Sequence, residues 1–217
     1  MKFNDITVPV YVRYTVLALL FVATALLVWA QFPVSAGNDA SITALHARIA
    51  LLEDQQETTD LAIEFGYDPM IVAVTRKLAA DAFRTRYCEC PTWRFVRSEK
   101  ELAYLLLSVI QIESGGNPRA FNPGGPAHGL TQLVMSTAQM YDKNVTAEGL
   151  FTIPKNLEIS MQHFVDLLER FHGNPTLSVI AWNRGAGGVA RSIALGESLE
   201  NGYAYLVFTR ATMRNAQ

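Results

Sequence analysis

Glu113 has the surroundings in this sequence that best suit acid–base chemistry. It follows the apolar run 102–110 and directly precedes a stretch rich in glycine and proline. A carboxyl group at the edge of an apolar pocket loses hydration when it ionises, so its pKa rises and it keeps its proton closer to neutral pH. Such a group is the general acid that cleavage of a glycosidic bond requires. The alternative is a glutamate at a helix end that faces solvent.

The residues before Glu113 predict a buried helix. Ser98 is followed three residues later by Glu101, which is the capping-box pattern of a helix start. The stretch 114–118 (SGGNP) predicts the end of the helix. Because 102–110 is apolar on nearly all sides, we expect this helix to be surrounded by others, with Glu113 at its carboxyl end.

Further helices are predicted on both sides of this one, and no segment shows the alternation of a strand. The expected ranges are 41–64, 69–86, 130–141, 156–171, 177–184 and 202–214. Asp68 and Pro69 supply an N-cap and a first-turn proline for the second of these. The stretch 87–97 has no clean period and is interpreted as a loop. The predicted fold class is all-α.

Composition limits the classes of function. A chain of 217 residues, 50% hydrophobic and 18% charged, holds one well-buried domain and an attachment segment. A net charge of −2 with no stripe of Lys and Arg argues against a nucleic-acid partner. Cys88 and Cys90 are too few for a disulfide framework and are interpreted as structural or incidental. An intermolecular bridge is the alternative.

No metal or cofactor is expected. His128, His163 and His172 do not show the paired spacing of metal ligands.

Residues 14–33 predict a membrane-spanning segment. No charged residue occurs from 14 to 38, and about 18 helical residues span roughly the hydrocarbon thickness of a bilayer. Lys2 and Arg13 precede this segment, so the positive-inside rule places the rest of the chain outside the cytoplasm. The alternative is a signal peptide that is cleaved after Ala36.

Several blocks after residue 98 resemble one enzyme family in order and near its spacing. They are Ile112–Ala120 (IESGGNPRA), Gly129–Gln132 (GLTQ), Thr137–Ala138, Pro154–Leu157 (PKNL), Ala181–Gly185 (AWNRG) and Tyr203–Val207 (YAYLV). These blocks resemble the lytic transglycosylase domain of the soluble lytic transglycosylase and goose-type lysozyme superfamily, over about residues 98–217. The resemblance implies a lysozyme-like helical fold, peptidoglycan as substrate and Glu113 as the catalytic acid/base.

The sequence departs from the family pattern at several positions. Thr131 stands where the family has methionine, and Trp182 stands where it has tyrosine. Trp182 either stacks on a sugar face or packs in the core. About one extra residue lies between Ala120 and Gly129. Either Tyr203 or Tyr205 matches the family's last tyrosine, and Tyr205 suits the Leu-Val that follows better.

The resemblance also implies which residues contact the substrate. Ser114 and Gln132 resemble positions that line the sugar cleft, and local loop capping is the alternative for each. Asn183 resembles a residue that contacts substrate near the acid. Tyr205 resembles the tyrosine that hydrogen-bonds or orients Glu113, with ordinary helix packing as its alternative.

The reaction implied by the resemblance needs a single carboxyl group. Glu113 protonates the bridging oxygen, the acetamido group of the muramyl sugar stabilises the cation, and Glu113 then accepts the C6 hydroxyl proton as a 1,6-anhydro ring closes. Glycosidases with two carboxylates need a partner about 5–9.5 Å away. Asp142 and Glu148 are candidates by nearness in sequence alone, and surface solvation explains them as well. Non-hydrolytic cleavage is therefore favoured.

The predicted organisation has three parts. An anchor or signal segment at 1–36 precedes a helical stalk or linker at 37–97 and a catalytic domain at 98–217. This arrangement predicts a single-pass protein of the cytoplasmic membrane, with the domain on its periplasmic face and peptidoglycan glycan strands as partner. One alternative is a non-catalytic, glycan-binding or structural component of envelope-spanning machinery, such as a secretion system or a phage virion. Another is a lysozyme-type hydrolase of the same fold.

Overall fold

The computed structural model describes residues 39–87, 96–199 and 202–212. The predicted membrane segment at 14–33, Cys88 and Cys90 lie outside these ranges. Within them, no helix combines the length and the apolar character needed to cross a membrane. The described residues from 53 onward form one compact unit, which contains the candidate site.

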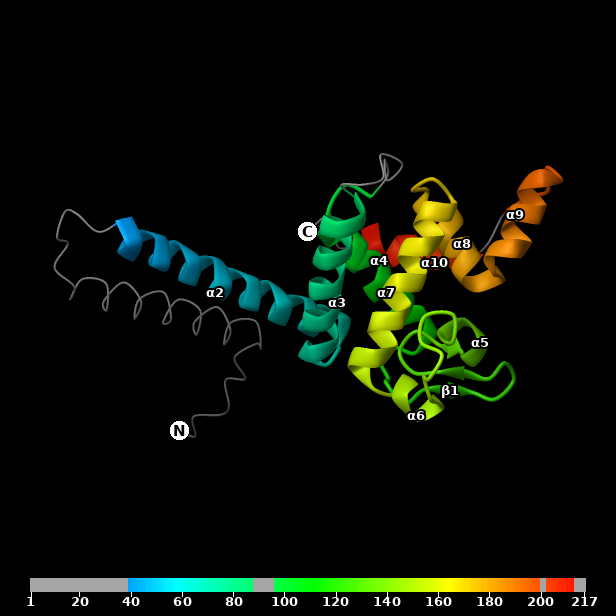
Figure 1. Ribbon diagram of the computed structural model, residues 1–217, viewed down its shortest axis with the longest axis horizontal. Coiled ribbons are helices and arrows are strands. Elements are labelled where there is room, and N and C mark those ends of the chain that lie inside the picture. Colours follow the sequence, from blue (N-terminus) through cyan, green and yellow to red (C-terminus); the bar gives the residue numbers. More distant parts are fainter. Residues whose placement is uncertain (1–38, 88–95, 200–201, 213–217) are drawn as a thin grey trace, which may run out of the picture. The chain divides into compact units, whose positions relative to one another are not determined.

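The described chain is mostly helical, as predicted (Figure 1). The helices are α2 (Asp39–Phe65), α3 (Pro69–Ala82), the π-helix η1 (Phe83–Tyr87), α4 (Glu99–Glu113), α5 (Met135–Ala138), α6 (Ala147–Leu150), α7 (Ile153–Arg170), α8 (Pro175–Arg184), α9 (Ala186–Ala194) and α10 (Gly202–Thr212). The predicted helix starts at Ser98 and Asp68 are confirmed, because each side chain caps the helix that follows.

A small antiparallel sheet interrupts the helices and departs from the all-α prediction. Its strands are β1 (Phe121–Asn122), β2 (Ala127–His128) and β3 (Leu133–Val134), paired in the order β1-β2-β3. Strands of two residues are too short to show an alternating pattern, which is why the sequence did not reveal them.

The prediction of a helix over 130–141 is wrong for most of that range. Gln132 has a φ of +51°, in the left-handed region, and Leu133 and Val134 pair with β2. Only α5 within this range is helical. The short helix α6 and the helix α9 were not predicted.

The helix α4 is buried on nearly all sides, as its sequence predicts. Residues 102, 103 and 105–110 are buried, and α3 and α10 both pack against α4. At its start, the hydroxyl of Ser98 accepts the N–H of Glu101 at 3.2 Å. The carboxylate of Glu101 accepts the N–H of Arg97 at 2.6 Å, one residue earlier than the usual capping box. The helix ends at Glu113, at the edge of this core.

Two groups of apolar side chains enclose α4. The larger joins it to α7, α8 and α10 and includes Leu106, Phe164 and Val207, which are fully buried. The second joins it to the end of α2 and to α3 and includes Ile71 and Leu107. Full burial of such a side chain contributes about 1.5–3 kcal/mol, so these contacts hold α4 in place.

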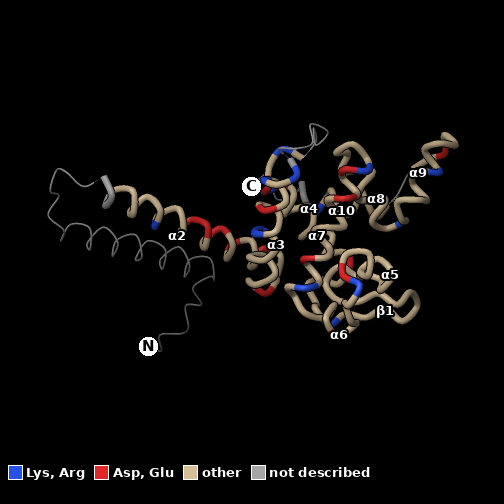
Figure 2. The backbone as a smooth tube through the Cα atoms, viewed as in Figure 1, with Lys and Arg blue, Asp and Glu red and all other residues tan. Residues whose placement is uncertain are grey.

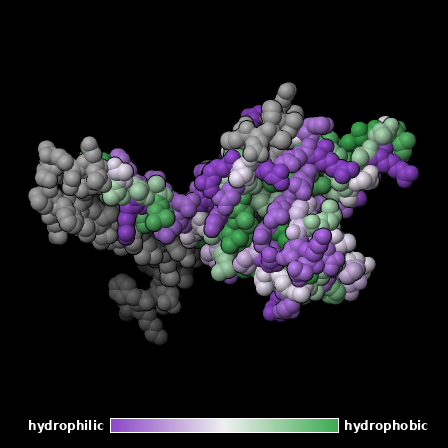
Figure 3. All heavy atoms as spheres, viewed as in Figure 1, coloured by the Kyte–Doolittle hydropathy of each residue, from purple (hydrophilic) through white to green (hydrophobic). Residues whose placement is uncertain are grey.

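Two surface features lie on α2 and α9. Acidic residues gather on the second half of α2 (Figure 2), where Asp54 and Glu57 pair with Arg76 of α3 at 2.7 and 2.8 Å. Hydrophobic side chains are exposed over α9 (Figure 3), where Ile193 lies in the helix and Leu195 directly follows it.

Gly129 lets the loop before Gln132 approach the start of α7. Its φ is +75°, and a Cβ atom there would lie 2.1 Å from the carbonyl oxygen of Leu150 and 2.5 Å from Nδ2 of Asn156. That Nδ2 donates to the carbonyls of His128 and Leu150 at 3.1 and 2.9 Å. A residue with a side chain therefore has no room at this position.

Replacing Gly129 with alanine should lower the free energy of unfolding by about 2 kcal/mol or more, because a strained φ and an overlapping Cβ each carry a cost. Urea denaturation measures this change. Gly125→Ala is the matched control, since nothing lies within 4 Å of a Cβ at Gly125. Equal denaturation midpoints for the two variants would contradict the argument.

Candidate functional site

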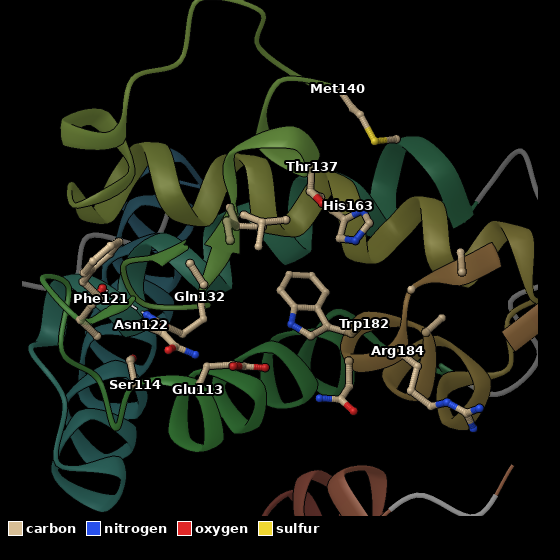
Figure 4. A pocket seen from close by; sticks show the side chains of 18 of the residues that line it. Glu113, Ser114, Phe121, Asn122, Gln132, Thr137, Met140, His163, Trp182 and Arg184 are labelled. Atoms are coloured by element: carbon tan, nitrogen blue, oxygen red, sulfur yellow. Dashed lines mark hydrogen bonds between the residues drawn. The ribbon is translucent and has the colours of Figure 1, made fainter. Parts of the chain in front are cut away.

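A cleft of about 970 Å³ runs past the carboxyl end of α4 (Figure 4). Its walls come from α4, the small sheet, α5, α7, α8 and the first residue of α9. Five of the six site residues predicted from the sequence line this cleft. They are Glu113, Ser114, Gln132, Trp182 and Asn183.

The carboxyl group of Glu113 lies in the cleft wall, with its pKa raised above 4.5 chiefly by burial. Two hydrogen bonds oppose that shift. Tyr203 donates its hydroxyl proton to Oε1 at 2.6 Å, and the indole of Trp182, whose nitrogen points toward the carboxyl group in Figure 4, also donates. Hydrogen bonds to a carboxylate favour the charged form. Glu113 therefore holds its proton to a higher pH than an exposed glutamate does. When it ionises, its carboxylate accepts hydrogen bonds from two donors.

Tyr203, and not Tyr205, contacts Glu113. Residues two apart on an α-helix point about 200° apart, so only one of them can face α4. Tyr205 is 72% exposed, whereas Tyr203 packs against the core. The expectation that Tyr205 orients Glu113 is thus wrong. The signal that identifies Tyr203 is its four-residue spacing from Val207, which is fully buried on the inward face of α10.

Gln132 is fixed on the cleft wall beside Glu113 (Figure 4). Its Nε2 donates to the carbonyls of Ala120 and Gly129 at 3.1 and 2.9 Å. These bonds hold the amide group while the backbone adopts the unusual φ of +51°. Backbone strain of this kind costs about 1–3 kcal/mol and persists where the surroundings enforce it.

Ser114 lines the cleft, but its hydroxyl is bonded to the surrounding loops. Its Oγ donates to the carbonyl of Leu130 at 2.6 Å and accepts the N–H of Gly116 at 3.2 Å. The side chain therefore ties the end of α4 to the opposite cleft wall, which is the loop-capping role considered as its alternative.

Trp182 packs on the core and lines the cleft at the same time. Its ring centroid lies 6.1 Å from that of Phe164 and 5.1 Å from that of His163. His163 also lines the cleft, a role that was not predicted from the sequence. It lies four residues after Ile159, which is buried, and a histidine on the inward face of a helix is the signal that identifies it.

Residues 96–202 match the family model of the transglycosylase SLT domain. The chain contains an SLT domain. The match includes the cleft-lining residues and ends directly before Tyr203. No solved structure matches the chain. Members of the SLT family are lytic transglycosylases, which supports an enzymatic activity on peptidoglycan for this domain at the family level.

The described residues of the cleft wall offer a single carboxyl group. Among the described residues that line it, Glu113 is the one acidic residue. Asp142 pairs with Lys155 at 3.3 Å, and Glu148 pairs with Arg119 at 3.6 Å, and neither acid lines the cleft. One buried acid can donate a proton and later accept one, but it provides no second carboxylate as a nucleophile or base.

The raised pKa of Glu113 predicts how Glu113→Gln changes stability with pH. Below 4.5 the folded and unfolded chains both carry the proton, so the variant should match the wild type. As pH rises above 4.5, the unfolded chain ionises first, and the wild type loses stability that the neutral glutamine keeps. The unfolding temperature of Glu113→Gln should then exceed that of the wild type at neutral pH.

Thermal unfolding across this pH range checks the prediction. Glu148→Gln is the control, because Glu148 is exposed on the surface and pairs with Arg119. A Glu113→Gln variant that is less stable than the wild type at neutral pH would indicate a carboxylate that the fold stabilises rather than a buried acid.

Proposed function

We propose that this SLT domain is a peptidoglycan lytic transglycosylase that cleaves the β-1,4 bond between N-acetylmuramic acid and N-acetylglucosamine, with Glu113 as acid and base. The observation that carries the proposal is a partly buried carboxyl group, hydrogen-bonded to Tyr203, which is the one acid among the described residues that line a cleft of about 970 Å³. The product of this reaction carries a 1,6-anhydromuramyl end.

Glu113 acts first as an acid. Burial keeps the proton on the carboxyl group, which donates it to the bridging oxygen as the bond between that oxygen and C1 breaks. The acetamido group of the substrate stabilises the cationic centre at C1. The Glu113 carboxylate that results is stabilised by Tyr203 and Trp182, which are already oriented toward it.

Glu113 then acts as a base. Its carboxylate accepts the proton of the C6 hydroxyl group while that oxygen bonds to C1 of the same sugar. Glu113 returns to its protonated state, and no water is consumed. A two-carboxylate hydrolase would instead need a second acid as nucleophile or base, and the described residues of the cleft wall include none.

We also propose that residues 14–33 anchor the protein in the cytoplasmic membrane, with the SLT domain on the outer face. The uncharged run in this segment and the position of Lys2 and Arg13 before it support this placement. Peptidoglycan lies on the same side of the membrane. A mature chain that starts at Gly37 would show instead that the segment is a cleaved signal peptide.

Digestion of purified murein, followed by mass analysis of the muropeptides, tests the proposed reaction. The wild type should release fragments with 1,6-anhydromuramyl ends, and Glu113→Gln should reduce the rate by about 100-fold or more, the contribution typical of a general acid.

Other outcomes of the digestion have distinct meanings. Reducing muramyl ends would identify a lysozyme-type hydrolase. A wild type that leaves murein intact under conditions in which it binds murein would favour a glycan-binding component of envelope-spanning machinery.

Tyr203→Phe removes the hydrogen bond to Glu113 and should act in two ways. The pKa of Glu113 rises further, so the alkaline limb of the rate profile moves to higher pH. The rate at the optimum should fall about 10- to 100-fold, because a hydrogen bond to a charged group is lost. The pH profile of murein cleavage measures both effects, and Tyr205→Phe is the matched control. Equal effects of the two substitutions would rule out this role for Tyr203.

A further inference from the structure

His163 faces the cleft from α7, beside the ring of Trp182 (Figure 4), and the mechanism above does not use it. Its Nδ1 lies 3.0 Å from the hydroxyl oxygen of Tyr141, in the segment between α5 and α6. The same hydroxyl donates to Oδ2 of Asp166 at 2.9 Å. Three side chains thus form a hydrogen-bonded chain that ends at the cleft.

The chain fixes the tautomer of His163. A carboxylate can only accept hydrogen bonds, so the single hydroxyl proton of Tyr141 goes to Asp166. The oxygen of Tyr141 must then accept a proton from Nδ1 of His163. In the neutral ring Nε2 consequently carries a lone pair and no proton.

The far end of the chain is held in place by a neighbouring helix. Arg86 of η1 pairs with Asp166 at 3.7 Å and with Glu169 at 3.3 Å. This cation lies beside the carboxylate that accepts the hydroxyl proton of Tyr141. The ring of His163 also packs against the rings of Tyr141 and Trp182, with centroids 5.7 and 5.1 Å away, so its orientation is constrained on two sides.

The side chain of His163 lines the cleft, and its Nε2 keeps some exposed surface. No described residue forms a hydrogen bond with it, and it is not among the buried side-chain atoms that lack a partner. Burial lowers the pKa of His163 by more than the nearby Asp166 raises it, so the neutral ring predominates at neutral pH. A fixed hydrogen-bond acceptor therefore faces the substrate space next to an aromatic ring.

We propose that Nε2 of His163 accepts the amide N–H of a substrate N-acetyl group whose methyl group lies against Trp182, which makes His163 a specificity-determining residue. A sugar hydroxyl both donates and accepts, so either histidine tautomer satisfies it. An amide N–H can only donate, so, unlike a hydroxyl group, it requires the tautomer with an unprotonated Nε2, which Tyr141 fixes. This inference rests on the proposed function, because it takes an N-acetylated glycan as the occupant of the cleft.

The tautomer and the contact can be observed without catalysis. Nitrogen NMR of the imidazoles in the full-length protein should show the proton of His163 on Nδ1, and Tyr141→Phe should abolish this preference. Addition of a tetramer of N-acetylglucosamine should then shift the Nε2 signal in the direction of an accepted hydrogen bond. A proton on Nε2 in the free wild type, or an Nε2 signal unchanged at saturating tetramer, would overturn the proposal.

Kinetics on murein separate binding from chemistry. His163→Leu should raise KM about tenfold with little change in kcat, and His163→Gln should restore most of the affinity because its amide oxygen accepts. A lower kcat with an unchanged KM for His163→Leu would contradict the assigned role. Unfolding temperatures of the variants identify any effect that comes from misfolding.

The pH dependence of KM supplies a further readout. Protonation of Nε2 removes the acceptor, so KM of the wild type should rise as pH falls through the pKa of His163, whereas KM of His163→Gln should not. The charged and titratable groups that face this ring are Asp166 and Tyr141, with Glu113 and Arg184 elsewhere on the cleft wall. A wild type that binds the tetramer but leaves murein uncut would refute the proposed reaction. The role of His163 would still be decided by the NMR result, which does not depend on cleavage.

Discussion

The burial of one carboxyl group at the end of an apolar helix is the constraint on which the rest of this site depends. Because α4 is apolar on nearly all sides, α3 and α10 must cover it, and this covering removes water from Glu113 at its carboxyl end. The helix α10 also brings Tyr203 to the carboxyl group. The packing that raises the pKa of Glu113 thus supplies a hydrogen-bond donor that stabilises its anion, and both forms of the acid are accommodated.

The wall beside Glu113 is positioned by a buried polar network. Oγ1 of Thr131 lies 2.9 Å from Oδ1 of Asn156 and 2.6 Å from Oγ of Ser160, and all three residues are fully buried. Thr131 stands where the resembled family has methionine, and Ser160 supplies the polar partner that a buried hydroxyl needs. Gly129 allows its loop to approach Leu150 and Asn156 closely. Together with this network, it positions the backbone from which the side chain of Gln132 reaches the cleft.

The sequence predicted the parts of this structure that depend on local pattern. The apolar run and the caps located α4, and the linked blocks identified Glu113 and four other cleft residues before any geometry was known. The sequence did not predict the features of the site that depend on tertiary contacts. The choice between Tyr203 and Tyr205 depends on which face of α10 meets α4, and His163 gains its place in the cleft through Tyr141 and Asp166. Strands of two residues carry no period at all.

A cleft whose described lining holds one acid favours chemistry in which the substrate provides its own nucleophile. Digestion of purified murein by the full-length protein in water labelled with heavy oxygen tests this claim most directly. If Glu113 works alone as acid and base, the new muramyl ends will be anhydro ends without the heavy isotope. One heavy oxygen atom at each new muramyl end would contradict the account, since it would show that water attacks the sugar.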